Sequence, residues 1–199
     1  MNFLTPTTEL EAINQMLSVI GESPVNTVED TGIIDAVVAR QILNQSSRDT
    51  QVVGWHWNTE IDFPLTQSFP EGELLLPPNT LKVDTTGADE SLDLVQRGNR
   101  LYDRKNHTFA VKKDVLVEIV LFLPFDELPE AARSYIAMRA ARVFQERMVG
   151  SDTLWRFNAN DELKAWSTLQ NAEAEAQDMN ILSESPSVAA VLNRRPGRG

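Results

Sequence analysis

The chain has 199 residues, of which 42% are hydrophobic, and its 18 Lys and Arg face 29 Asp and Glu, so the formal net charge is −11. The apolar content suits a soluble fold with a sizeable core, no apolar run is long enough to cross a bilayer, and the first residues do not read as a signal peptide. The acidic excess argues against a protein that holds nucleic acid by its phosphates, and the lack of cysteine excludes disulfides, thiolate metal sites and cysteine nucleophiles.

The first predicted element is a helix that begins near Thr8. Thr8 and Glu11 have the spacing of a capping box, in which the hydroxyl and the carboxylate each accept a hydrogen bond from a free backbone N–H. Apolar residues then recur at steps of three and four until Gly21, which suits the C-cap of a helix.

A second helix follows, with Asp30 or Thr31 as its expected N-cap. Its apolar stripe is interrupted at Gln45 and Ser46, where the same face turns polar, and is expected to recover at Val52 and Val53. The helix is predicted to end near Gly54.

Trp55 and Trp57 are two positions apart, which would place both rings on one face of a strand. Two interpretations are open: the rings pack against the base of the helices, the commoner role of aromatic residues, or they form an exposed platform for a sugar or a subunit. His56 and His107, the two histidines of the chain, lack the spacing of a metal site and are interpreted as structural or solvated.

The middle of the chain predicts β hairpins. Its prolines confine the first strands to sheet edges, and Leu74, Leu75 and Leu76 form either a short buried strand or a partner-facing patch. A strand over 81–84 and a hairpin turning at Gly98 and Asn99 follow. The nearly continuous apolarity of residues 115–123 predicts a strand that is buried on both faces.

A third helix is predicted after residues 126–130, whose acids and proline suit a helix N-terminus. Four arginines fall mostly off its apolar stripe, which indicates either a solvated face or a basic face against neighbouring acidic subunits: Arg133, Arg139, Arg142 and Arg147. A fourth helix begins at Ser151 or Asp152, and residues 158–160 are a possible interruption of it.

Beyond Met179 the helical pattern ends in a segment typical of a flexible terminus. It contains an apolar island over 188–192 followed by Arg194 and Arg195, so the segment is either a frayed end or an arm that orders on an acidic partner.

These elements predict an α+β fold with an inserted domain. The N- and C-terminal helix pairs, residues 1–54 and 125–180, are expected to form an antiparallel four-helix bundle, because each pair can best bury its stripe against the other. Residues 55–124 form an inserted antiparallel β domain, and residues 181–199 a flexible C-terminal arm.

The sequence offers little for catalysis. It has no glycine-rich phosphate loop and no nucleophile elbow. Asp126 and Glu130 could be imagined as the acid and base of a glycosidase, but both lie at a helix start, where capping explains them. We therefore expect no enzyme and no cofactor.

Several segments, taken in order, resemble the tail tubular protein A family, the head-to-tail adaptors of short-tailed bacteriophages. They are Ile-Gly-Glu-Ser-Pro-Val at 20–25, Gly-Trp-His-Trp-Asn at 54–58, Gly-Asn-Arg-Leu-Tyr-Asp-Arg at 98–104 and Phe-Asp-Glu-Leu-Pro-Glu at 125–130. The similarity covers most of residues 9–180 and does not extend clearly to the C-terminal tail.

The resemblance implies a structural virion protein of the tail, assembled in the host cytoplasm. It implies a dodecameric ring between the portal and the tail nozzle, tubular protein B, through which double-stranded DNA is ejected without sequence-specific binding and without a membrane partner. An acidic lining would repel the DNA phosphates. A tail-associated glycan hydrolase, acting on capsular polysaccharide or cell wall, is the alternative.

A ring of this kind needs contact residues. The resemblance implies that the C-terminal arm embraces the portal, and the residues expected to do so, or to meet a neighbouring subunit, are Val188, Val191, Leu192, Arg194 and Arg195. The candidate subunit contacts are Leu74, Leu75, Leu76, Trp55 and Trp57, because a ring requires two unlike surfaces that meet.

Overall fold

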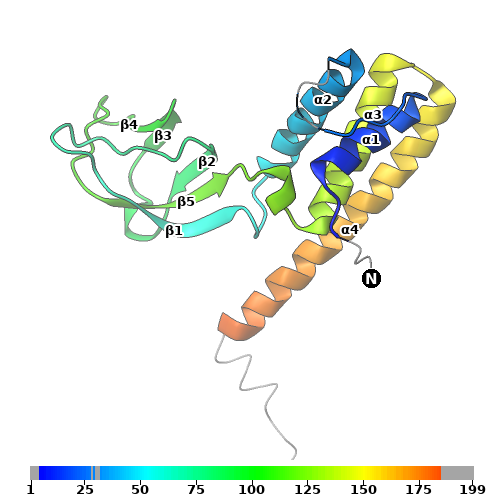
Figure 1. Ribbon diagram of the computed structural model, residues 1–199. Helices are drawn as coiled ribbons and strands as arrows, with labels where there is room; N and C mark the ends of the chain where they lie inside the picture. The colour runs from blue at the N-terminus through cyan, green and yellow to red at the C-terminus, as the bar shows by residue number, and fades with distance from the viewer. Residues whose placement is uncertain (1–4, 28, 30–31, 185–199) are drawn as a thin grey trace, which may run out of the picture.

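A computed structural model describes residues 5–27, 29 and 32–184 of the chain (Figure 1). It confirms the α+β class and places the strands between two pairs of helices. The helices are α1 (Glu9–Val19), α2 (Ile34–Gln51), α3 (Glu130–Met148) and α4 (Asp152–Glu184). The strands are β1 (Thr59–Leu65), β2 (Thr80–Thr85), β3 (Leu94–Arg97), β4 (Arg100–Asp103) and β5 (Val115–Leu121). Within the described residues, no helix is at once long and apolar enough to traverse a lipid bilayer.

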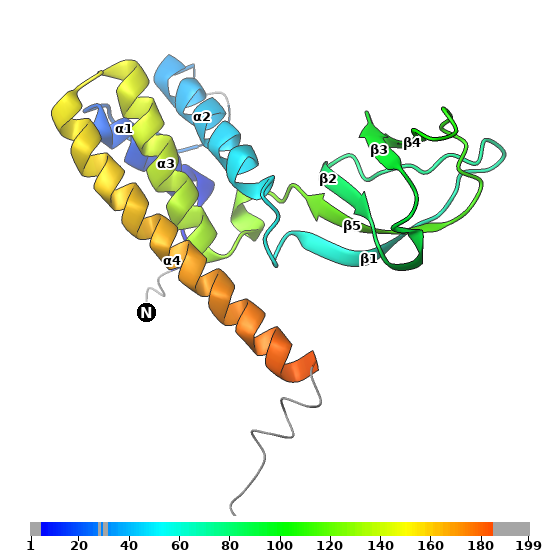
Figure 2. The same ribbon diagram turned by 180° about the vertical axis from the view of Figure 1, so that it is seen from behind.

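The helices share one hydrophobic core, which we call the helical domain. Buried side chains from α1, α2 and α3 form its centre, and Leu169 of α4 joins them. Helix α3 contacts each of the other three, whereas α4 packs mainly along α3, as the view from behind shows (Figure 2). The N-terminal and C-terminal helices therefore bury their apolar faces against each other, as the order of elements predicted.

The ends of α1 match the sequence prediction. The Thr8 hydroxyl accepts a hydrogen bond from the Glu11 backbone N–H, and the Glu11 carboxylate accepts one from the Thr8 N–H, so the capping box is complete. Gly21 ends the helix with φ of 82°, a conformation that glycine adopts without strain. By contrast, the N-cap of α2 is Ile33, which has no side-chain cap, and Asp30 and Thr31 lie outside the described residues.

The buried face of α2 continues through the polar residues after Gln45, whereas Val52 and Val53, where the apolar stripe was expected to recover, are 45% and 61% exposed, so that prediction was wrong. Ser46, Ser47, Thr50 and Gln51 are all buried. The Thr50 hydroxyl donates to the Ser46 carbonyl at 2.8 Å, so the helix itself satisfies this polar group. The polar residues thus continue the buried face of the helix instead of ending it.

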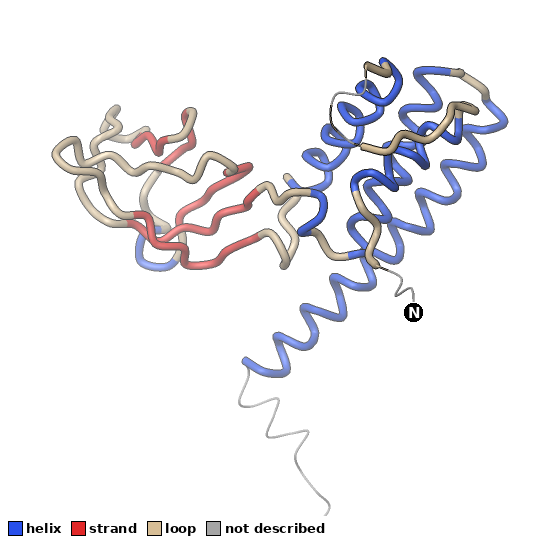
Figure 3. Tube along the Cα trace, in the orientation of Figure 1, coloured by secondary structure: helices blue, strands red, loops and turns tan. Residues whose placement is uncertain are grey.

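The β domain projects sideways from the helices (Figure 3). It contains a three-stranded antiparallel sheet in the order β1-β5-β2 and a separate β3-β4 hairpin that turns at Gly98 and Asn99, as predicted. Pro64 lies on β1, an edge strand, where its missing N–H costs no ladder hydrogen bond.

The central strand β5 is buried mainly on one face, so the prediction of burial on both faces was wrong. Val115, Val117 and Ile119 point into the core of the β domain, but Leu116 on the opposite face is 40% exposed. On the same face as Leu116, Glu118 is partly buried and Val120 is 2% exposed, so this face is covered only near the end of the strand that approaches the helices.

Helix α4 continues through residues 158–160 without interruption and extends past residue 180, where the sequence suggested the arm begins. Its last part runs beyond the other helices (Figures 1 and 2). The rest of the predicted arm, residues 185–199, lies outside the described residues.

Candidate assembly surfaces

A hydrogen-bond network connects the end of α2 to the strand that leads back to the helices. The Gln51 side chain donates from Nε2 to the Leu123 carbonyl at 3.0 Å and accepts at Oε1 from the Leu123 N–H at 2.8 Å. Asn58 donates from Nδ2 to the carbonyls of Gln51 and Leu121, each at 3.0 Å. The chain passes between the helical and β domains twice, once after α2 and once after β5. Because Gln51 and Asn58 are both buried, these bonds hold the two passages together in one geometry.

The tryptophan pair sits in a turn at this same junction, so the prediction that it forms a strand was wrong. The Asn58 N–H donates to the Trp55 carbonyl at 3.0 Å and closes the turn. The two rings still stack, with centroids 6.3 Å apart, and Trp166 of α4 meets Trp55 edge-on at 5.6 Å. Trp55 is buried in the core of the helical domain, and its indole N–H donates to the Thr50 carbonyl.

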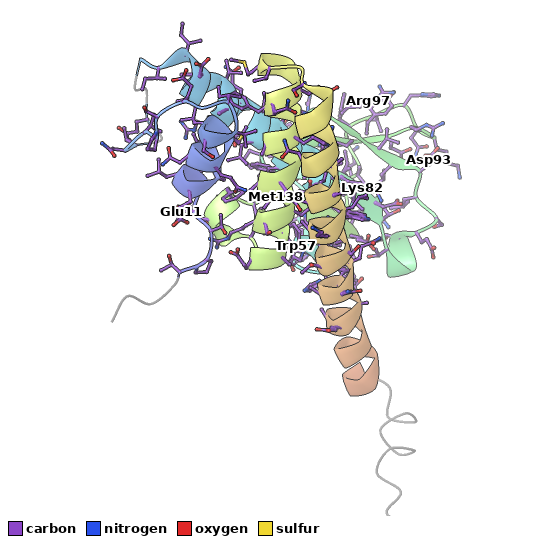
Figure 4. All side chains as sticks on the ribbon, turned by 90° about the vertical axis from the view of Figure 1, so that its right-hand side faces the viewer. Glu11, Trp57, Lys82, Asp93, Arg97 and Met138 are labelled. Carbon is purple, nitrogen blue, oxygen red and sulfur yellow. The ribbon has the colours of Figure 1, made fainter. Side chains whose placement is uncertain are left out.

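Trp57 is only partly buried against the same core. Its indole nitrogen is nevertheless enclosed and has no hydrogen-bond partner in the part of the chain that the structure describes. Figure 4 labels Trp57, which lies next to Trp55 through the stacked rings. Of the two tryptophans proposed as subunit contacts, Trp57 is thus the one with accessible surface.

A groove of about 330 Å³ opens beside the junction. Its apolar wall includes Val53, Ile61 and Val120, and its polar groups are Lys82, Glu118 and the ion pair of His56 with Glu173. The His56 backbone N–H also donates to the Glu173 carboxylate at 3.0 Å, so His56 connects the junction turn to α4. This role fits the structural interpretation of that histidine.

The arginines of α3 bond to their own chain more than the sequence suggested. Arg133 donates to the carbonyls of Leu128, Thr7 and Asp126, and its side chain is only 12% exposed. Arg142 pairs with Glu162 of α4 and with Glu146.

Arg139 is tied to its surroundings as well. It donates to the Tyr135 hydroxyl at 3.1 Å and lies 3.8 Å from the Asp49 carboxylate. Burial of the Arg139 guanidinium opposes its charge, but the contact with Tyr135 and the nearby carboxylates outweigh burial and raise its pKa. Three of the four arginines therefore hold the helical domain together.

Asp126 and Glu130 have structural partners at the start of α1. Glu130 accepts from the Thr7 backbone N–H and from the Thr7 hydroxyl, both at 2.7 Å, and Asp126 accepts from the Glu9 N–H at 3.3 Å. Both carboxylates thus accept hydrogen bonds from the backbone at the start of α1. This structural role accounts for their position without a catalytic one. No group of three or more His, Asp and Glu in the described chain could hold a metal ion.

The three leucines proposed as subunit contacts differ in accessibility. Leu74 and Leu76 are buried in the core of the β domain, whereas Leu75 is 50% exposed. Just before them Phe69 is 95% exposed, in the loop that connects β1 to β2.

The residues proposed to bind the portal lie outside the described residues. They are Val188, Val191, Leu192, Arg194 and Arg195.

The β domain carries a basic segment that the sequence analysis overlooked. Residues 97–113 hold six Lys and Arg and one Asp, whereas the other residues of 55–124 hold ten acids and one Lys. Arg97 lies over the Tyr102 ring at 3.6 Å and Arg100 over the Phe109 ring at 4.2 Å, while the two rings meet edge-on. A count of charge along the chain, in windows shorter than a domain, would have found this segment.

The sheet next to this segment is acidic on its open face. Asp84 on β2 lies directly opposite Glu118 on β5, an arrangement of like charges that weakens a sheet. At the rim of the basic segment, hydrogen bonds from Lys113 and the Leu116 N–H lower the pKa of Asp89. Figure 4 shows Lys82, Asp93 and Arg97 spread over this domain, behind the helices.

Comparison with known proteins gives two matches. The tail tubular protein family matches over residues 10–179. A protein named tail tubular protein A, from Klebsiella phage KP34, is 32% identical over 129 residues, which cover 65% of this chain and 67% of the relative. Both matches confirm the resemblance drawn from the sequence segments.

Proposed function

Because the chain belongs to the tail tubular protein family, it is a structural component of a bacteriophage virion tail, and we propose that it is the adaptor that joins the portal to the tail nozzle. In this proposal, copies of the chain form a closed ring, expected to be dodecameric, around the path of the ejected DNA. The family match over residues 10–179 carries the proposal, because it includes both the helical domain and the β domain.

The shape of the chain supports the proposal. A β domain that projects from the helices gives each subunit two separate bodies, so one body can contact a neighbour without disturbing the core of the other (Figures 1 and 3). The buried network of Gln51 and Asn58 holds the two bodies in a fixed relation, which a ring of defined diameter requires.

The charge of the helical segments suits a DNA conduit. Residues 1–54 and 125–184 hold 18 acids against 8 Lys and Arg. In addition, Arg133, Arg139 and Arg142 are engaged inside the subunit. A wall with this balance repels phosphates at short range, so DNA would pass without adhering.

The last residues are proposed to contact the portal. The apolar residues Val188, Val191 and Leu192 followed by Arg194 and Arg195 would add both buried area and charge to such a contact. Helix α4 extends beyond the other helices, which fits a role in bringing the residues that follow it in the sequence to a partner outside the subunit.

The test is the mass of the assembly. Native mass spectrometry of the full chain, alone and with the purified portal, is expected to show a closed oligomer or a portal-bound ring. Removal of residues 185–199 is expected to weaken portal binding and to leave the fold intact. A chain that stays monomeric under both conditions contradicts the adaptor proposal.

A further inference from the structure

One surface of the β domain combines exposed apolar side chains with exposed basic side chains. We define the distal surface as Phe69, Leu75, Arg97, Lys105 and Lys112. Phe69 is 95% exposed, Leu75 is 50% exposed, and the three basic residues are also exposed. An apolar anchor within a charged rim is the composition of a protein–protein contact.

Hydrogen bonds hold the loop that carries Phe69 against the basic segment. The Lys112 N–H donates to the Gly72 carbonyl at 3.1 Å, and Glu73 pairs with Ala110 in a β-bridge. Arg100 adds two hydrogen bonds to the Glu73 carboxylate, at 2.8 and 3.0 Å. The anchor and the basic residues therefore move as one surface.

The groove at the domain junction has the complementary character. Val53 is 61% exposed and Ile61 is 72% exposed, so its apolar wall is open to solvent. Glu118 and Glu173 line the groove, and Asp84 lies opposite Glu118. Lys82 and His56 are the basic groups of the groove, and His56 contacts the Glu173 carboxylate, so Glu118 and Asp84 carry the negative charge that a basic surface would meet. On the distal side, Glu71 is exposed two positions from Phe69 and is itself negatively charged.

We propose that the distal surface of one subunit docks into the junction groove of a second copy of this chain, with Phe69 placed between Val53 and Ile61. The inference rests on the proposed ring and names the contact that would close it. The groove lies at the junction with the helices, whereas the β3-β4 hairpin lies at the other end of the β domain (Figure 1), so we infer that the two surfaces do not meet within one chain. A head-to-tail contact of unlike surfaces repeats from subunit to subunit until the ring closes.

A second copy accounts for the distal surface better than DNA does. Arg100 and Arg104 are already paired with Glu73 and Asp93, and Lys113 is paired with Asp89, which reduces the positive charge left for phosphates. The most exposed residue of the surface is Phe69, which gains nothing from a phosphate backbone. Burial of Phe69 against Val53 and Ile61 removes apolar area from water on both sides of the contact.

Disulfide trapping tests the contact directly, because the natural chain has no cysteine. The chain with both Phe69→Cys and Ile61→Cys is expected to form a ladder of covalent oligomers under mild oxidation. Ile61 lies on β1, four residues before its end at Leu65, and Phe69 lies in the loop beyond it. A disulfide within one chain would leave a monomer on a non-reducing gel, so a ladder reports bonds between chains. Each single variant alone and a Ser18→Cys/Ile61→Cys chain are the controls and should give no ladder.

Charge reversal tests the complementarity. Lys105→Glu with Lys112→Glu makes the distal surface acidic, and Asp84→Lys with Glu118→Lys makes the groove basic. Each pair alone is expected to lower the yield of trapped oligomers about tenfold or more. A mixture of the two variants should restore the yield, because each then offers the surface that the other lacks.

The outcomes separate this inference from the adaptor proposal. Oligomers that form without the Phe69–Ile61 ladder, and that ignore both charge reversals, overturn the inference and leave the ring in place. A chain that is monomeric alone and with portal overturns both. Salt-sensitive binding of duplex DNA that is lost in the Lys105/Lys112 variant, with oligomers unchanged, would assign the distal surface to phosphates instead.

Discussion

Gln51→Ala should destabilise the protein more than its place at the end of a helix suggests. The side chain is fully buried and makes three hydrogen bonds, one to the Ser47 hydroxyl and two to the backbone of Leu123. Alanine removes all three and leaves the Leu123 N–H and carbonyl without their protein partner at a partly buried position. The change therefore affects the crossing between the two domains and not only α2.

The size of the effect follows from the number of backbone groups that lose their hydrogen-bond partner. Each buried backbone group left without a partner costs about 1–3 kcal/mol, and Leu123 is only partly buried, so the lower half of that range applies to each. Two such groups and a small cavity give a loss of about 3 kcal/mol in the free energy of unfolding. Gln51→Leu fills the cavity but leaves the same Leu123 N–H and carbonyl without a partner. It should therefore lose most of the same free energy of unfolding.

Gln45→Ala is the matched control, because Gln45 lies on the same helix and bonds only to the exposed side chains of Asp49 and Arg48. It should cost less than about 0.5 kcal/mol. Urea unfolding followed by tryptophan fluorescence measures both variants, and hydrogen exchange at residues 121–123 reports on the junction. If Gln51→Ala and Gln45→Ala unfold at the same urea concentration, the assigned role of Gln51 is wrong.

Three further predictions concern other parts of the fold. Thr8→Ala removes the capping box of α1 and should cost about 1 kcal/mol in urea unfolding; an unchanged midpoint would contradict the assignment. Arg133→Lys can keep only part of the fork to three carbonyls, so it should cost about 2 kcal/mol and speed proteolysis ahead of α1. Hydrogen bonds from the backbone and side chain of Asn106 lower the pKa of Asp103 below its ordinary value of 3.8. This bonding therefore stabilises the fold above pH 3.8 and is lost as the pH falls through the lowered pKa; an NMR titration should show the Asp103 pKa rise in Asn106→Ala.

The sequence predicted the local elements well where short-range physics decides them. The capping box at Thr8, the glycine that ends α1 and the turn at Gly98 and Asn99 all depend on residues a few positions apart, and the structure confirms each. The order of helices and strands also indicated that the two ends of the chain share a core, because amphipathic helices must bury their stripes.

The errors occur where long-range contacts decide. Gln45 and Ser46 were interpreted together as a break in the stripe of α2, but Ser46, Thr50 and Gln51 are buried against partners that the sequence does not reveal. Trp55 and Trp57 stack in a turn because Asn58, Gln51 and α4 position them, not because they share a strand. The arginines of α3 were likewise assigned to a surface although two of their carboxylate partners lie on α2 and α4.

The distribution of charge matters more for assembly than its total. A chain of net charge −11 repels its own copies, and the repulsion falls off over about 8 Å at physiological salt. Residues 97–113, with six basic groups and one acid, give one part of the β domain a positive local charge. The sheet and the groove keep a negative local charge elsewhere in the domain. Two copies are then attracted in the head-to-tail orientation and repelled in most others, so the same acidic excess that keeps DNA from adhering would also select the register of the ring.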